Sequence, residues 1–243
     1  MWAILLLLVL GQGPNSEVKT AQRQFPALVT RTAAVDGIRT LIVHHEDSTA
    51  HSHKVIFWFH GMGGFHGFAA NMYPQAMKLA QRHISFTIVE PEMPWSVYAK
   101  HPDGRRPWAN GGFKRYAEAA LATIPKTHNP RLIYVAGHSR GGKGIAYAAA
   151  QGGLCEMPIA GVLWSDATYG DWFKKAWSAC LRHMPSKVEV LYLRRTETAG
   201  FLSAAQQDPE FHKVKQASFS FPWWYHGKIG DNALTLSRLT GEP

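Results

Sequence analysis

The chain has 243 residues, of which 46% are hydrophobic and 18% are charged. This length suffices for one medium-sized domain with a full core, and the apolar share excludes an intrinsically disordered protein. The formal net charge of +9 favours anionic partners, but the basic residues are scattered and form no nucleic-acid-binding motif. We therefore expect a globular protein with a basic surface and no nucleic-acid partner.

The N-terminus is a nearly unbroken apolar run over residues 1–10, followed by glycines. This pattern is typical of the hydrophobic part of a secretory signal, although no Lys or Arg precedes it, and the run is too short to span a bilayer. We expect a signal segment over residues 1–13, a polar extension over residues 14–26 and a single domain over residues 27–243. The protein is then exported, to the periplasm or the medium. The alternative is an apolar segment that packs on the domain.

The sequence contains two cysteines, Cys155 and Cys180. In an oxidising compartment they could form one disulfide. Two separate buried thiols fit the sequence equally well. Both alternatives stay open at this point.

Apolar runs and turn residues predict a hairpin followed by alternating strands and helices. Two apolar stretches, residues 27–32 and 38–45, flank Asp36-Gly37, which is typical of a hairpin turn. The later strands are continuous apolar runs, which favours a parallel sheet covered on both faces. The predicted strands are residues 54–59, 85–89, 132–136, 159–164, 188–193 and 218–221, and the predicted helices are residues 69–82, 113–124, 141–151, 172–181 and 232–239.

Two connections between predicted elements differ from the others in length. Residues 90–112 form a long predicted loop rich in Pro, Trp and Gly. The interval over residues 166–187 has room for about one helix. We therefore expect no large cap domain over the sheet.

The sequence Gly137-His138-Ser139-Arg140-Gly141 lies between a predicted strand and a predicted helix. A serine on such a tight turn needs small flanking residues, and the two glycines provide them. The helix N-terminus behind the serine presents N–H groups and a positive dipole end to developing negative charge. The pattern predicts a nucleophile, since the Lys-Ser/Thr pair of a phosphate-binding loop is missing.

With this motif the chain resembles the α/β-hydrolase superfamily over roughly residues 54–239. The resemblance implies an α/β fold with a mostly parallel central sheet, an N-terminal antiparallel hairpin and helices on both faces. It also implies an acyl-enzyme mechanism that needs no cofactor and no metal. A His-Gly turn over residues 60–64 matches the oxyanion turn of the superfamily. The backbone N–H groups of Met62 and Arg140 would accordingly hold the oxyanion.

His226 matches the general base of the superfamily by its position. It follows the last predicted strand and precedes the final predicted helix. The chain has 13 histidines, so position and not residue type selects this one. The nearest rival, His212, falls before the last strand. We expect His226 to take the proton of Ser139.

The catalytic acid has two candidates. Asp166 directly follows a predicted strand, where a buried carboxylate can hold the imidazole. Glu197 follows the next strand, where the superfamily more often carries the acid, but Arg194 and Arg195 offer it a solvated ion pair. The Ser-Asp-Ala-Thr-Tyr-Gly sequence around Asp166 also resembles a group of small exported hydrolases. We favour Asp166 and keep Glu197 as the alternative.

Several aromatic and basic residues fall in or beside loops at the catalytic end of the predicted sheet. Aromatic rings stack on sugars or grip acyl chains, and arginines bind carboxylates. The competing interpretation is that the tryptophans pack the loops and the arginines face solvent. The candidates for substrate binding are Trp95, Trp108, Arg105, Trp223 and Trp224.

Four histidines lie close together in the sequence, at His44, His45, His51 and His53. Such a group raises the question of a metal site. No Cys or carboxylate joins them at a zinc-site spacing, so we expect a solvated loop and no metal.

These observations predict a serine hydrolase that cleaves a carboxylic ester or a related acyl bond. Its substrate would be a small molecule or a polymer, such as anionic cell-envelope material, and an ester is favoured over a peptide bond by analogy. The alternatives are an amidase or peptidase on the same triad, and a non-catalytic protein that binds a glycan or peptide on a hydrolase scaffold. The sequence leaves the natural substrate and the oligomeric state open.

Overall fold

The computed structural model describes residues 23, 27–61, 68–93, 108, 112–124, 131–168, 171–184, 187–194, 207–220, 222 and 224–240. The predicted signal segment lies outside these ranges, as does nearly all of the polar extension. None of the helices within them is long and apolar enough to cross a membrane.

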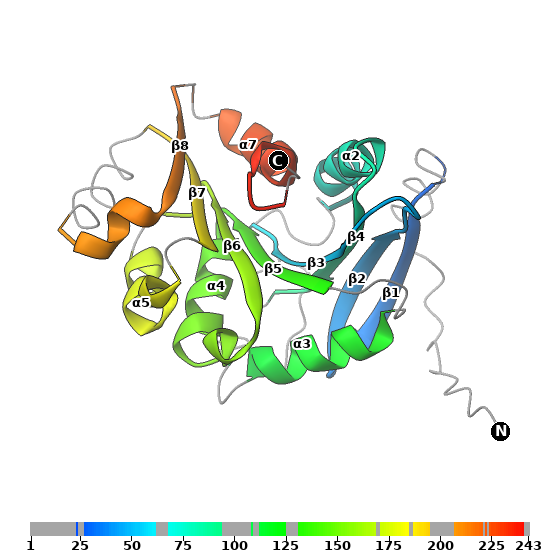
Figure 1. The fold of residues 1–243 in the computed structure, drawn as a ribbon, viewed down its shortest axis with the longest axis horizontal. Helices are drawn as coiled ribbons and strands as arrows, with labels where there is room; N and C mark the ends of the chain where they lie inside the picture. The colour runs from blue at the N-terminus through cyan, green and yellow to red at the C-terminus, as the bar shows by residue number, and fades with distance from the viewer. Residues whose placement is uncertain are drawn as a thin grey trace.

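The centre of the fold is an 8-stranded mixed sheet with helices on both faces (Figure 1). Its strands are β1 Val29–Val35, β2 Ile38–His45, β3 His53–Phe59, β4 Ser85–Pro91, β5 Arg131–His138, β6 Ile159–Ser165, β7 Val188–Leu193 and β8 Lys215–Phe219. They lie in the order β1-β2-β4-β3-β5-β6-β7-β8. β1 and β2 are antiparallel, as are β2 and β4, whereas the remaining neighbours are parallel. The parallel strands therefore end at one common edge of the sheet.

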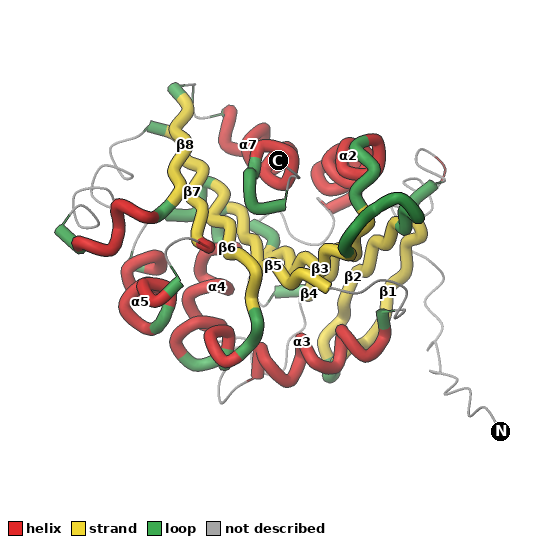
Figure 2. Tube along the Cα trace, in the orientation of Figure 1, coloured by secondary structure: helices red, strands yellow, loops and turns green. Residues whose placement is uncertain are grey.

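Helices cover both faces of the sheet (Figures 1 and 2). α2 Phe68–Gln81 and α7 Tyr225–Leu236 lie side by side on the first face, and α3 Gly112–Thr123, α4 Gly141–Ala150 and α5 Trp172–Ala179 lie on the second. Short 3-10 helices occupy η3 Leu154–Glu156, η4 Leu181–His183 and η6 Pro209–Lys213. The two buried clusters of apolar side chains fill the spaces between each helix layer and the sheet.

The predicted N-terminal hairpin is confirmed. Val35 pairs with Ile38 across a two-residue turn. Asp36 and Gly37 have φ angles of 48° and 76°, which is the left-handed backbone that a tight hairpin turn requires. The predicted Asp-Gly turn thus joins the two antiparallel strands that the sequence indicated.

The predicted bounds of the last strand and helix are wrong. β8 begins and ends earlier than residues 218–221, and α7 begins at Tyr225 instead of residue 232. Gly227 and Gly230 weaken the helical signal in this segment, since glycine is the poorest helix former after proline. Packing on the sheet overrides that preference. His226 therefore lies in the first turn of α7 and not in a loop before it.

α7 is held in place at several points along its length. The buried side chain of Gln75 on α2 donates to the Gly230 carbonyl over 3.1 Å and accepts the Leu234 N–H over 2.9 Å. Beyond its C-terminus, Glu189 at the start of β7 accepts a hydrogen bond from the Ser237 hydroxyl over 2.8 Å and from the Arg238 N–H over 3.0 Å. These contacts fix the helix that carries His226.

A disulfide joins Cys155 of η3 to Cys180 at the end of α5, with the two Cα atoms 6.1 Å apart. It connects the segment after α4 to the segment after α5. The structure therefore selects the paired cysteines from the two alternatives that the sequence left open.

Candidate active site

Ser139 occupies the turn between β5 and α4. Its φ angle is 56°, a left-handed conformation that is unfavourable for residues other than glycine. Its backbone N–H donates to the Ser165 carbonyl over 3.1 Å, which ties the turn to the end of β6. The predicted strand-turn-helix around the serine is thus present, with the strain that such a turn requires.

Two glycines allow the end of β3 to approach this turn closely. A Cβ atom on Gly141 would lie 1.9 Å from the carbonyl oxygen of Phe59. A Cβ atom on Gly61 would lie 3.0 Å from the Cβ of Ser139. His60-Gly61, the described part of the His-Gly turn after β3, therefore lies against the serine turn.

His60 fixes the start of that His-Gly turn. The buried ring accepts the Met93 N–H at Nε2 over 3.0 Å, so its hydrogen is on Nδ1, which donates to the Gly61 carbonyl over 2.7 Å. Burial lowers the pKa of His60 to about 4, so the ring is neutral at physiological pH. His60 thus ties the segment after β3 to the segment after β4. No local sequence pattern predicts this separate role for His60.

Asp166 and His226 are brought together from sequence positions 60 residues apart. His226 Nδ1 lies 2.6 Å from Asp166 Oδ2. The other carboxylate oxygen, Oδ1, accepts the Leu193 N–H over 3.0 Å, and the backbone N–H of Asp166 donates to the Leu191 carbonyl over 2.7 Å. The carboxylate is therefore fixed by the end of β7.

The exposure of the two side chains differs. The Asp166 side chain is 3% exposed, whereas that of His226 is 27% exposed. Because an ionised carboxylate only accepts, the contact holds the hydrogen of a neutral imidazole on Nδ1. The lone pair is then on Nε2.

His138, the residue before the serine, contacts His226 in two ways. The two ring centroids lie 4.4 Å apart with 35° between the ring planes. His138 Nε2 lies 2.9 Å from the carbonyl oxygen of His226. A carbonyl oxygen accepts only, so His138 Nε2 carries a hydrogen and donates it. The end of β5 is thereby joined to the first turn of α7, a contact that the sequence analysis missed.

Of the remaining predicted site residues, two lie at helix starts, one lies in the core, and the rest lie outside the described residues. Arg140 immediately precedes α4, where helix N–H groups lack intrahelical partners. Trp224 immediately precedes α7 and is 58% exposed. Trp108 is fully buried against Phe59 and Phe113, so it is a core residue. The other candidates, Met62, Trp95, Arg105, Glu197 and Trp223, lie outside the described residues.

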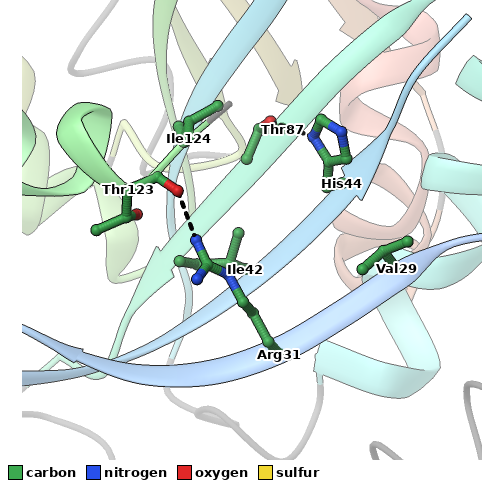
Figure 3. A pocket seen from close by; sticks show the side chains of 7 residues that line it. All are labelled: Val29, Arg31, Ile42, His44, Thr87, Thr123 and Ile124. Carbon is green, nitrogen blue, oxygen red and sulfur yellow. Dashed lines mark hydrogen bonds between the residues drawn. The ribbon is translucent and has the colours of Figure 1, made fainter. Parts of the chain in front are cut away.

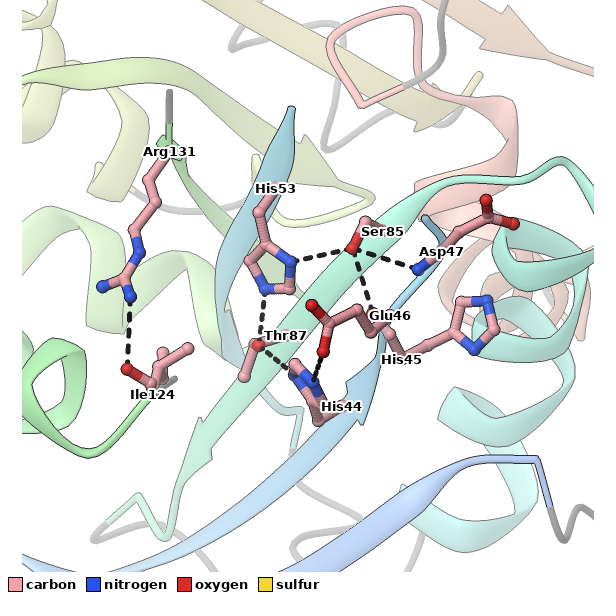
Figure 4. Close-up of polar contacts among 9 residues, drawn as sticks. All are labelled: His44, His45, Glu46, Asp47, His53, Ser85, Thr87, Ile124 and Arg131. Carbon is pink, nitrogen blue, oxygen red and sulfur yellow. Dashed lines mark hydrogen bonds and ion pairs between the residues drawn. The ribbon is translucent and has the colours of Figure 1, made fainter. Parts of the chain in front are cut away.

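His44, His45 and His53 lie where β3 and β4 begin, at the opposite edge of the sheet, and Figure 4 shows their polar contacts. The expectation of a solvated loop is wrong for His53, which is buried in β3. Its Nε2 lies 2.8 Å from the Thr87 hydroxyl and its Nδ1 3.0 Å from the Ser85 hydroxyl, while His44 Nδ1 lies 2.9 Å from the same Thr87 oxygen. His44 Nε2 also lies 3.8 Å from the Glu46 carboxylate, whose side chain is 39% exposed, so these rings have hydroxyl partners and one solvated carboxylate. Across the described ranges, no three His, Cys, Asp or Glu side chains form a group that could hold a metal ion.

A cavity of about 170 Å³ lies beside this second group of histidines (Figure 3). Arg31 spans its side and donates to the Thr123 carbonyl over 2.9 Å. The lining residues are Val29, Arg31, Ile42, His44, Thr87, Thr123 and Ile124. The cavity is mostly apolar and lies away from the serine turn.

No family model matches the chain, and no curated protein is significantly similar to it in sequence. Many solved structures are similar to it in fold. The 2,6-dihydroxy-pseudo-oxynicotine hydrolase has a TM-score of 0.54 at 15% identity, over 88% of this chain and 68% of the other. The S-formylglutathione hydrolase from Staphylococcus aureus has a TM-score of 0.53 at 10% identity, over 88% and 96% of the two chains. An esterase of the bacterial hormone-sensitive lipase family has a TM-score of 0.52 at 12% identity, over 88% and 86%.

Similarity at these low identities establishes the fold alone. The mixed sheet with its N-terminal hairpin, the parallel strands that follow and the two helix layers agree with the fold that the sequence predicted. The chain therefore has the α/β-hydrolase fold, which it shares with solved esterases and related hydrolases.

Proposed function

We propose that the protein is a serine hydrolase that cleaves a carboxylic ester or a related acyl bond. His226 Nε2 takes the proton of Ser139, whose oxygen attacks the carbonyl carbon and forms an acyl-enzyme. The protonated imidazole then gives its proton to the leaving group, and water attacks the acyl-enzyme by the same route. Asp166 orients the imidazole and stabilises its positive charge.

The observation that carries this proposal is the 2.6 Å contact between His226 and Asp166. A solvated surface pair would leave both groups exposed, whereas this carboxylate is buried and its second oxygen is held by the Leu193 N–H. The arrangement lies next to a strained serine turn. Buried acid, partly exposed base and strained nucleophile are the features that acyl transfer requires.

The start of α4 is the proposed site that stabilises the oxyanion. The Arg140 N–H at the helix start and the positive end of the helix dipole are suited to a tetrahedral intermediate that carries negative charge. Met62, in the His-Gly turn, is the second proposed donor. Two fixed donors of this kind contribute several kcal/mol to the barrier.

We propose an ester as the substrate, by analogy with the esterases that share the fold. The net charge of +9 favours an anionic or polymeric substrate, of which cell-envelope material is an example. The exposed ring of Trp224, two residues before His226, is suited to stack on such a substrate. The alternative is an amide or peptide bond cleaved by the same residues.

A fluorophosphonate probe tests the proposal, because it reacts with an activated serine. The folded protein is expected to be labelled, and Ser139→Ala is expected to abolish labelling. Ser218→Ala on β8, which removes a hydroxyl that accepts from Arg194, is the matched control and should label normally. Absence of labelling, or labelling that survives Ser139→Ala, would instead support a non-catalytic glycan-binding or peptide-binding protein.

A panel of esters of increasing acyl length, amides and peptides then separates the two reactions. Higher kcat/KM for esters is expected. Release of soluble product from an anionic cell-envelope polymer would support the polymeric substrate, and no release would exclude it.

We also propose that the protein is exported. The apolar run at residues 1–10 and the disulfide between Cys155 and Cys180 support an oxidising compartment. Sequencing the N-terminus of protein purified from the source cells tests this, and a mature chain that begins after about residue 13 is expected. Retention of the complete N-terminus in the cytoplasmic fraction would contradict it.

A further inference from the structure

His138 is in direct contact with the proposed general base, yet the proposed reaction assigns it no part. Its ring packs on the ring of His226 with 4.4 Å between centroids. Its Nε2–H also holds the His226 carbonyl over 2.9 Å. One side chain therefore contacts both the ring and the backbone of the proposed base.

These contacts complete the constraints on the His226 imidazole. Asp166 holds one ring atom, Nδ1, and a single hydrogen bond still permits the ring to pivot about that atom. The ring of His138 limits the pivot from one face, and its hydrogen bond to the His226 carbonyl fixes the backbone from which the ring projects. Since Ser139 follows His138 directly, the same residue relates the nucleophile to the base.

The packing around His138 leaves its ring little freedom. A Cβ atom on Gly230, one turn along α7 from His226, would lie 2.8 Å from the Cε1, Cγ and Nδ1 atoms of the His138 ring. These are the three atoms nearest to that position. The absence of a side chain at Gly230 thus makes the space that the His138 ring occupies.

We infer that His138 is a positioning residue: it holds the imidazole of His226 in line with the oxygen of Ser139, and Gly230 provides the space for it. The inference rests on the proposed function and adds a residue to it. His138 exchanges no proton with the substrate. It acts by restricting the orientation of His226, and misplacement of a catalytic group by about 1 Å costs about 100-fold in rate.

The first test is a set of substitutions at His138 in the full-length protein, with an ester substrate. His138→Ala is expected to lower kcat by about 10-fold to 100-fold with KM changed by less than about twofold. His138→Phe keeps a ring against His226, and His138→Gln keeps a donor for its carbonyl, so each should restore part of kcat. His53→Ala is the matched control, since that ring is buried and hydrogen-bonded at the opposite edge. It should lower the melting temperature and leave kcat unchanged.

The second test uses Gly230→Ala in two backgrounds. In the wild type the added methyl group displaces the His138 ring, so kcat should fall. In His138→Ala that ring is absent, so Gly230→Ala should leave kcat unchanged. The same substitution should then raise the melting temperature, because alanine favours the helix. A merely local disturbance of α7 predicts equal losses in both backgrounds.

A third measurement does not need turnover. The hydrogen shared by His226 and Asp166 should give a downfield proton resonance, and its exchange with solvent should accelerate in His138→Ala. Unchanged exchange, a kcat for His138→Ala equal to that of His53→Ala, or equal effects of Gly230→Ala in both backgrounds would each overturn the inference. Failure of the proposed function differs from these results, since it shows as a wild-type protein without labelling that depends on Ser139.

Discussion

Histidines gather at both edges of the sheet, and their partners differ. Where the parallel strands end, His226 contacts the buried carboxylate of Asp166. Where they begin, buried His53 contacts the hydroxyls of Ser85 and Thr87. The carboxylate contacts at that edge lie at the surface, since Glu46 beside His44 is 39% exposed and His83 beside Asp47 is itself 76% exposed, against 3% for Asp166. A buried carboxylate orients an imidazole and stabilises its charged form more strongly than a solvated one does. The burial of the carboxylate partner, and not the number of histidines, therefore distinguishes a candidate catalytic edge from a structural one.

Left-handed backbone occurs at both edges, since His83 before β4 has a φ angle of 58°, but at the catalytic edge it falls on two proposed site residues. Ser139 and Asp166 have φ angles of 56° and 42° at the ends of β5 and β6. Both residues project from strained turns next to His226. Strain of this kind persists where the surrounding structure over-determines the conformation, which is common at functional sites.

The largest effect expected at the catalytic edge follows from Asp166→Asn. The amide cannot stabilise the charged imidazole, and it favours the wrong tautomer, so kcat should fall by about 10⁴-fold while the fold is retained. Steady-state kinetics and circular dichroism measure the two properties. Glu197→Gln is the control for the alternative acid, and a loss of that size in Glu197→Gln alone would transfer the role of Asp166 to Glu197.

A smaller but substantial effect is expected from Gly141→Ala behind the serine. The new Cβ would overlap the carbonyl oxygen of Phe59, so the free energy of unfolding should fall by about 3 kcal/mol. Gly227→Ala on α7 is the matched control, since within the described residues no atom beyond its own helix backbone and chain neighbours lies within 4 Å of its Cβ position. That variant should gain up to about 1 kcal/mol from helix propensity. Urea unfolding measures both, and equal stabilities would contradict the close approach of β3.

At the opposite edge, His53→Ala should affect stability and not catalysis. It removes one partner from each of the Ser85 and Thr87 hydroxyls and leaves a cavity, so the free energy of unfolding should fall by about 2 kcal/mol. The kcat value should equal that of the wild type. A large loss of kcat at constant KM would contradict the purely structural role of His53 at this edge.

The last comparison is between two buried carboxylates, Glu90 and Glu189, and concerns how the free energy of unfolding depends on pH. Glu90, near the end of β4, has no hydrogen-bond partner for either oxygen within the described part of the chain. Burial, with a further contribution from the Glu92 charge, raises the pKa of Glu90 well above its usual value. The folded protein thus binds this proton more tightly than the unfolded chain does. Stability is present below the ordinary carboxyl pKa and is lost as pH rises toward the raised pKa.

Glu90→Gln should remove this dependence and stabilise the protein on the order of 1 kcal/mol at pH 8. Glu189→Gln is the opposite case, since Glu189 accepts from Ser237 and Arg238 at the start of β7. The Glu189→Gln variant should lose about 2 kcal/mol of its free energy of unfolding. Unfolding free energies of both variants and the wild type, measured from roughly pH 4 to pH 8, test these expectations, since the Glu90 proton is lost within that range in the unfolded chain first. A Glu90→Gln variant whose stability parallels the wild type at every pH would contradict the buried, unpaired carboxyl.

Local patterns predicted the features that depend on neighbouring residues. The Asp36-Gly37 turn, the strand before Ser139 and the helix after it all follow from short apolar runs and small residues. The start of α7 was missed because Gly227 and Gly230 lower helix propensity, while the packing of Gly230 against His138 is a tertiary contact. The burial of His53 was missed for the same reason, since its hydroxyl partners come from β4.

The sequence by itself determined the hairpin, the order of strands and helices, and the conformation that Ser139 must adopt, because each depends on residues within one short segment. Only the tertiary structure decided which groups meet. Asp166 reaches His226 because β6 lies beside β5 and the first turn of α7 lies at the ends of both, although 60 residues separate the two in the chain. The contact between His138 and His226, separated by 88 residues, has the same origin. Sheet order brings such residues together, and no local pattern encodes it.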